Sequence, residues 1–76
     1  MKRAKEGTIG WRIRLLRKQQ RLTQTEFGKK IYTTKGTVRN WESNISSPQC
    51  DFVIAICKTF DVSADWLLGL KGEEKS

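Results

Sequence analysis

Apolar residues recur along the chain at the three- and four-residue spacing that places side chains on one face of an α-helix. Clear examples are Ile9, Ile13 and Leu16 near the start, and the dense apolar run between residues 50 and 60. Shorter apolar pairs, separated by polar stretches, complete the pattern. The sequence therefore predicts an all-α fold with helices at residues 9–20, 24–31, 35–42 or 35–43, 48–60 and 64–68.

Two of these predicted helices have strong signals at their first residues. Thr23 is followed three residues later by Glu26, which is the spacing of a capping box, where each side chain accepts a hydrogen bond from the other residue's backbone N–H. Thr34 is placed to cap the next helix. Two capped helices separated by about three residues are the arrangement of a helix-turn-helix, a motif that reads DNA.

The later part of the chain is expected to complete the core. Ser47 is expected to cap the fourth helix, with Pro48 at its first position, where a missing N–H costs nothing. Ser63 is expected to cap the fifth helix, and Gly69 to end it. The predicted core face of the fourth helix comprises Cys50, Val53, Ile54, Cys57 and Phe60, with Ile56 beside them.

Charge is abundant and unevenly distributed. The 76 residues include 15 Lys+Arg and 8 Asp+Glu, a formal net charge of +7. Residues 1–42 contain 12 basic and 3 acidic side chains, a net +9, whereas residues 43–76 contain 3 basic and 5 acidic ones, a net −2. A basic half that contains the paired helices indicates a polyanionic partner, with nucleic acid favoured over an anionic membrane.

Several function classes lack the residues that they need. The chain has no histidine, no metal-ligand cluster and no glycine-rich phosphate loop, so we expect no enzyme, no metal and no cofactor. Cys50 and Cys57 would lie about 10.5 Å apart along one helix, too far for a disulfide, and are expected to be small core residues.

The chain also lacks any window of about 18 consecutive apolar residues and any apolar run after its basic start. We therefore expect a cytoplasmic, nucleoid-associated protein with no membrane partner. The predicted organisation is a flexible basic arm at residues 1–8, one helical domain at residues 9–69 and a polar tail at residues 70–76. The chain's short length suggests no ligand-sensing domain, so no small-molecule ligand is expected.

Two surfaces stand out on the predicted helices. The outward face of residues 35–43 contains no acidic residue, and lysine, arginine and asparagine are side chains that donate to base edges and phosphates. An ordinary solvated helix face would have a similar composition. On the first helix, Trp11 and Leu15 lie outside the apolar stripe. They either contact another protein or pack over the helix's own arginine stems.

Several motifs, taken in order, resemble the phage repressor and Cro-like helix-turn-helix family, which includes many small bacterial regulators. They are Ile9-Gly10-x-Arg12-Ile13, Leu22-Thr23-Gln24-x-Glu26-Phe27, Thr37-Val38-x-x-Trp41-Glu42, Pro48 and Val62-Ser63-x-Asp65-Trp66-Leu67-Leu68-Gly69. The resemblance implies a compact five-helix bundle whose third helix lies in the major groove. It also implies an ion pair between Arg17 and Glu42 that fixes the recognition helix against the first helix.

The resemblance, together with the basic residues around the paired helices, indicates the candidate site residues. Base reading is expected of Lys35, Gly36, Arg39 and Asn40. Phosphate contact or positioning is expected of Gln24, Thr34, Thr37, Ser43, Asn44, Arg12 and Lys30, with backbone amides acting at Ser43 and Asn44. The chain departs from the family at Tyr32, where relatives usually have glycine, and we expect the turn to differ in shape there. It departs again at Gly36, which offers no side chain to a base.

These expectations describe a sequence-specific double-stranded DNA-binding transcriptional regulator. It would be a repressor that binds a palindromic operator as a homodimer. The alternative is an antitoxin-like or anti-repressor protein-interaction module that uses the same fold.

Overall fold

The computed structural model describes residues 7–70. Five helices are present: α1 (Ile9–Gln19), α2 (Gln24–Lys30), α3 (Lys35–Glu42), α4 (Cys50–Phe60) and α5 (Ala64–Leu68). The predicted five-helix, all-α fold is confirmed, and α1 and α2 each end one residue earlier than predicted. Most of the predicted arm and tail, residues 1–6 and 71–76, lies outside the described residues.

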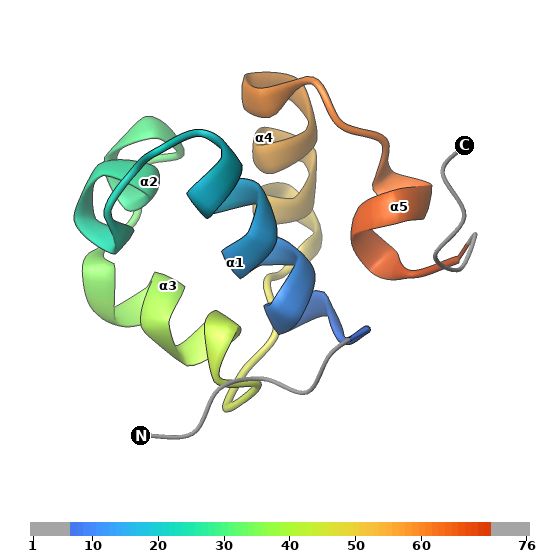
Figure 1. The fold of residues 1–76 in the computed structure, drawn as a ribbon, viewed down its shortest axis with the longest axis horizontal. Helices are drawn as coiled ribbons and strands as arrows, with labels where there is room; N and C mark the ends of the chain where they lie inside the picture. The colour runs from blue at the N-terminus through green and yellow to red at the C-terminus, as the bar shows by residue number, and fades with distance from the viewer. Residues whose placement is uncertain (1–6, 71–76) are drawn as a thin grey trace.

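Helix α1 lies between the other helices in the view of Figure 1. The α2–α3 pair lies on one side of α1 and α5 on the other. Helix α3 packs against both α1 and α2, and α5 packs against both α1 and α4. The α2–α3 pair is therefore joined to α1 through α3.

The core is built from the apolar faces of all five helices. Ile13, Phe27, Val38, Ile56 and Leu67 are each fully buried. The rings of Phe27 and Phe60 stack at a centroid distance of 4.8 Å, and those of Trp41 and Phe52 meet edge-on at 5.3 Å. Each aromatic pair joins α4 to the helix-turn-helix, because Phe27 lies in α2 and Trp41 in α3.

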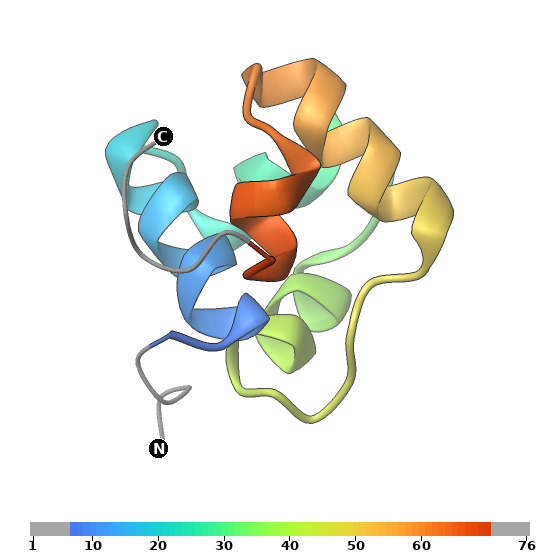
Figure 2. The same cartoon turned by 90° about the vertical axis from the view of Figure 1, so that its right-hand side faces the viewer.

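The predicted start of α4 is wrong. Gln49 is the N-cap in an extended conformation and makes no side-chain capping bond, so Ser47 and Pro48 precede the helix. These residues belong to the connection that crosses from α3 to α4 on the outside of the bundle (Figure 2). Cys50 is consequently at the first position of α4 and is exposed rather than in the core.

The predicted core face of α4 needs a second correction. Ile54 is 48% exposed, whereas Ile56 is fully buried. At about 100° per residue, Ile54 lies about 160° around the helix from Ile56, so the two cannot share a face. Cys57 and Phe60 are half-buried and pack against the core, as predicted.

All five helices within residues 7–70 end in the same way. The residue that follows each helix or its C-cap is left-handed, and the next N–H donates to a carbonyl five residues earlier, as in a Schellman motif. The left-handed residues are Arg21, Tyr32, Asn44, Asp61 and Gly69. Of these, only Gly69 is a glycine, and it ends α5 as predicted.

Tyr32 therefore adopts the backbone conformation that relatives give to glycine. Its φ is 65°, so the expectation that the turn would change shape is wrong. The left-handed conformation costs a tyrosine about 1–2 kcal/mol. The turn keeps its geometry because the N–H groups of Tyr32 and Thr33 donate to the carbonyls of Lys29 and Gly28, at 3.3 and 2.8 Å.

Gly28 permits the close approach of another backbone. A Cβ built at Gly28 would lie 2.9 Å from the carbonyl oxygen of Thr33 and 3.2 Å from that of Thr34. The approaching backbone belongs to Thr33 and Thr34, at the turn between α2 and α3. The glycine thus sets how tightly α2 and α3 are joined.

Candidate nucleic-acid interface

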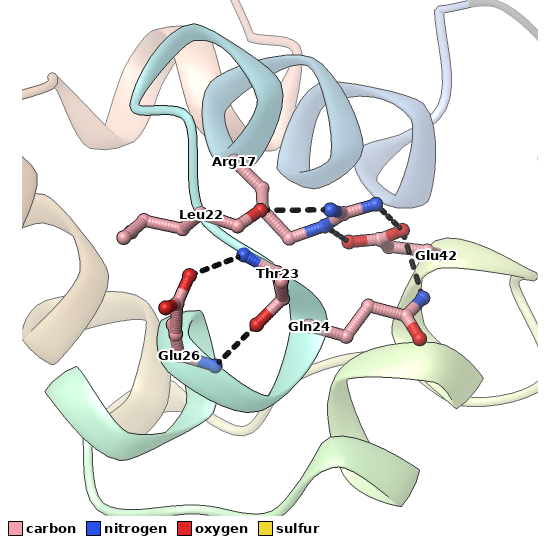
Figure 3. A network of polar contacts seen from close by, with 6 residues as sticks. All are labelled: Arg17, Leu22, Thr23, Gln24, Glu26 and Glu42. Carbon is pink, nitrogen blue, oxygen red and sulfur yellow. Dashed lines mark hydrogen bonds and ion pairs between the residues drawn. The ribbon is translucent and has the colours of Figure 1, made fainter.

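A buried ion pair connects α1 to α3 (Figure 3). The Nε atom of Arg17 lies 2.6 Å from Oε2 of Glu42, and the second bond, from NH2 to Oε1, is 3.0 Å long. The side chains are 11% and 5% exposed. Two parallel bonds fix both the distance and the orientation of the two helices, as a single contact between flexible side chains would not.

The same ion pair extends to α2. Arg17 also donates from NH1 to the carbonyl of Leu22 at 2.9 Å, and Gln24 donates from its amide to Oε1 of Glu42 at 3.2 Å. Figure 3 shows these bonds converging from the α1–α2 connection, α2 and α3. The predicted Arg17–Glu42 pair is present, and the bond to the Leu22 carbonyl is an addition that the sequence did not indicate.

Capping fixes the first turns of α2 and α3. The Thr23–Glu26 capping box has both of its bonds, at 2.9 and 3.0 Å. Thr34 accepts from the N–H of Thr37 at 3.3 Å, and the hydroxyl groups of these two threonines lie 3.1 Å apart. Both predicted caps are confirmed, and the hydroxyl group of Thr37 is held by its neighbour.

The outer face of α3 is basic and polar. Lys35, Gly36 and Arg39 are exposed, and Asn40 is half-buried. The one acidic residue of α3, Glu42, is 4% exposed and faces Arg17 in the interior. The helix thus presents lysine, arginine and amide groups to solvent without any carboxylate beside them.

Sequence similarity places this arrangement in a known family. A family model described as "Helix-turn-helix" matches residues 13–67. The chain belongs to the helix-turn-helix family. The expected helix-turn-helix family is therefore confirmed, and the matched region includes α2, α3 and the turn between them.

Two curated relatives are similar over most of the chain. An uncharacterized HTH-type transcriptional regulator, YobD of Bacillus subtilis (strain 168), is 34% identical over 59 residues, which are 78% of this chain and 53% of YobD. Antitoxin PezA of Streptococcus pneumoniae serotype 4 is 33% identical over 67 residues, which are 88% of this chain and 40% of PezA. The chain thus spans about half or less of the length of these relatives.

Solved structures share the fold. The P22 c2 repressor in complex with a synthetic operator matches with a TM-score of 0.76 and 30% identity, covering 80% of this chain and 92% of that one. A chain of the SinR protein/SinI protein complex matches with a TM-score of 0.77 and 28% identity, covering 91% of this chain and 68% of that one.

Ser43 and Asn44 differ from the expected helix-turn-helix phosphate loop. Their N–H groups donate to the carbonyls of Arg39 and Trp41, both at 3.0 Å, so these amides complete the end of α3. The Asn44 side chain accepts from the N–H of Gly10 at 3.2 Å and donates to the Thr8 hydroxyl at 2.9 Å. The side chain of Asn44 therefore attaches the loop to the first turn of α1. The backbone N–H groups of Ser43 and Asn44 already have carbonyl acceptors within the protein.

The contact between Asn44 and Thr8 was not predicted from the sequence, although the capping role of Thr8 has a sequence signal. Thr8 directly precedes the first apolar residue of α1 and caps that helix by accepting from the N–H of Trp11 at 3.3 Å. A threonine at this position is a normal N-cap signal. Its contact with a residue 36 positions away has no local signature.

Arg12 does not belong to the exposed surface. It is 3% exposed, and its NH1 group donates to the carbonyl of Gly7 and lies beneath Gly69. A guanidinium buried in this way is not available to phosphates, so the expectation that Arg12 contacts DNA is not carried forward. Lys30, in contrast, is exposed in the last turn of α2 beside Lys29.

The remaining expectations concern metals, membranes and the Trp11–Leu15 pair. Residues 7–70 contain no group of three or more side chains suited to a metal ion. None of the helices in that range is long and apolar enough to cross a membrane. Trp11 and Leu15 are both half-buried and lie outside the residues packed on the core.

Proposed function

We propose that this chain is a sequence-specific double-stranded DNA-binding transcriptional regulator, a repressor, that inserts α3 into the major groove of a palindromic operator as a homodimer. The observation that supports this most strongly is the outer face of α3, where Lys35 and Arg39 are exposed and Glu42 is turned inward onto Arg17. The similarity to the P22 c2 repressor, solved on a synthetic operator, supports the same function.

The proposal gives separate roles to the exposed residues. Lys35 donates to guanine O6 or N7, and Asn40 forms a bidentate pair with adenine, each worth about 1–3 kcal/mol of discrimination. Arg39 contacts a base or a phosphate, and Gly36 lets the helix approach the bases closely. Backbone contact and positioning fall to Gln24, Thr34, Thr37 and Lys30, with Gln24 acting through its bond to Glu42.

The geometry of the groove supports the proposed homodimer. In a two-fold complex, two copies of α3 enter successive major grooves about 34 Å apart, and the operator repeats its half-site in inverted order. One copy of α3 has only two turns and reads only a few base pairs. A second copy is therefore needed for a site long enough to be specific.

Selection of bound duplexes from a random pool tests the proposal directly. We expect enrichment of an inverted repeat whose half-sites are centred about one helical turn apart. Lys35→Ala should lose the preference at one base pair of each half-site, whereas Lys58→Ala, which removes the same charge from the exposed surface of α4, should retain the whole preference. A pool without any enriched sequence would contradict sequence-specific reading.

A second candidate function is a protein-interaction module of the antitoxin or anti-repressor type. The similarity to antitoxin PezA over 88% of this chain favours it. Trp11 and Leu15, which are half-buried outside the core, are its expected contact residues. A small partner that copurifies in stoichiometric amount with the wild type, but not with Trp11→Ala, would support this function.

A further inference from the structure

Tyr32 combines two features that are each unfavourable for folding. Its backbone is left-handed, with φ at 65°, and its side chain is 92% exposed. A large aromatic ring in solvent gains almost no burial that would offset the backbone conformation. Strained residues that persist without a packing reason are concentrated at functional sites, so Tyr32 calls for a functional reason.

The turn holds Tyr32 in this conformation regardless of its side chain. The hydrogen bonds from Tyr32 and Thr33 to α2 close the turn, and the Thr33 carbonyl fits against Gly28, where a Cβ would lie only 2.9 Å away. Glycine at position 32 would satisfy the same bonds without strain. The tyrosine side chain is therefore not needed to form the turn.

The position of Tyr32 relative to α3 indicates which part of a bound DNA duplex the Tyr32 ring would contact. Tyr32 lies three residues before Lys35, the first residue of α3, so their Cα atoms are within about 11 Å. A helix with its side chains is about 10–12 Å wide, and the major groove is about 12 Å wide. Once α3 occupies the groove, the segment that leads into it passes the sugar-phosphate strand at the groove edge.

Basic residues surround the same turn. Lys29 and Lys30 are exposed in the last turn of α2, and Lys35 is exposed after the turn. Lys29 and Lys30 provide cations for phosphates beside Tyr32. A tyrosine among them offers a flat apolar ring to deoxyribose and a hydroxyl group that donates to a phosphate oxygen.

We propose that Tyr32 is a DNA-backbone contact residue, packing its ring on a deoxyribose and donating its hydroxyl group to a phosphate beside the groove that α3 occupies. This inference rests on the proposed function. Because the contact is with the backbone, it adds affinity for all sequences and no discrimination among them.

Tyr32→Gly tests this proposal through two readouts that should move in opposite directions. Relief of the left-handed strain should raise Tm by about 4–8 °C. Loss of the contact should weaken binding to selected and random duplexes alike by about threefold to tenfold. The slope of binding against salt should stay the same, because no charge is removed. Tyr32→Phe, which keeps the ring, should retain part of the affinity.

The possible outcomes separate this inference from the proposed function. Full operator affinity in Tyr32→Gly would overturn the contact while leaving the proposed function intact. A fall in Tm together with affinity would also overturn it, because the loss would then follow from folding. Absence of DNA binding by the wild type in the selection experiment would overturn both.

Discussion

Arg17 and Glu42 are 25 residues apart in sequence, yet they meet through two nearly parallel bonds of 2.6 and 3.0 Å in the interior. This pair fixes how α3 is oriented on α1. Because Gln24 donates to the same carboxylate, a single glutamate connects α1, α2 and α3. The outer face of α3 is thereby held in one orientation by groups on its inner face.

Removal of either partner of this pair should be strongly destabilising. Arg17→Met or Glu42→Leu leaves the other charge buried without its partner, at a cost of about 3–5 kcal/mol in the free energy of unfolding. The double variant should cost less than the sum of the two, with a coupling of about 0.5–3 kcal/mol. Urea denaturation of the wild type, both single variants and the double variant measures the cycle.

A milder substitution at Glu42 keeps the experiment informative if Glu42→Leu does not fold. Glu42→Gln keeps the shape of the side chain and should lower the free energy of unfolding less than Glu42→Leu does. Single variants with wild-type stability, and additive behaviour in the double variant, would show that the pair is not an important constraint on α3.

Gly28 and Gly36 should respond oppositely to the same substitution. In a helix interior, alanine is more favourable than glycine by about 0.5–1 kcal/mol. At Gly28 the added methyl group would lie 2.9 Å from the Thr33 carbonyl, so Gly28→Ala should be destabilising despite this preference. At Gly36 the nearest atom, the Thr34 hydroxyl oxygen, is 3.9 Å away, and Gly36→Ala should be neutral or stabilising.

Thermal unfolding of these two variants measures the difference. Gly36→Ala acts as the matched control, because it applies the same chemical change to a helix of the same motif. Equal Tm values for the two variants would mean that the α2–α3 turn can move away from position 28 without cost.

Features with a local cause were predictable from the sequence. Thr23 and Glu26 are three residues apart, and their reciprocal bonds need nothing beyond one helical turn. The helix bounds and most core positions likewise follow from apolar spacing. The Arg17–Glu42 pair is a long-range contact, and only the resemblance to a family indicated it.

Features decided by the path of the chain were not predictable. Ser47-Pro48 has the pattern of a helix start, but the connection from α3 uses these residues to reach α4. Arg12 has the composition of a DNA-contacting residue, but the packing of Gly7 and Gly69 around it encloses its guanidinium. Tyr32 has an unfavourable side chain for its turn, but backbone bonds to α2 decide its conformation.

The two cysteines should differ in reactivity. Cys50 is exposed at the start of α4, whereas Cys57 is half-buried, and burial raises the pKa of the Cys57 thiol. Because the thiolate is the reactive form, iodoacetamide should modify Cys50 first in the native protein. Mass spectrometry of the digested protein measures the two rates, and in urea the rates should become equal. Faster modification of Cys57 in the native protein would contradict this order.

The direction of the Cys57 shift also determines a pH effect. With its pKa raised in the folded state, Cys57 retains its proton to higher pH when folded than when unfolded. The stability that the protonated Cys57 thiol contributes is therefore present at pH values below the pKa of the unfolded thiol. It is lost as the pH rises through the pKa of the folded thiol. Cys57→Ser should remove this alkaline decline, whereas Cys50→Ser should leave it unchanged.

Asn40 and Lys30 should affect DNA binding in different ways if α3 reads bases. Asn40→Ala should relax the preference at one base pair of each half-site, costing about 1–3 kcal/mol on the selected operator and little on random DNA. Lys30→Ala should weaken binding to all duplexes alike and reduce the slope of log affinity against log salt by about one. Titrations of both variants on operator and random duplexes at several salt concentrations separate these effects.

Lys58→Ala controls for the loss of one exposed lysine and should leave the affinity and the salt slope near wild type. Equal losses for Asn40→Ala on the two duplexes would show that Asn40 contacts the backbone, and the reading of bases would then rest on Lys35 and Arg39.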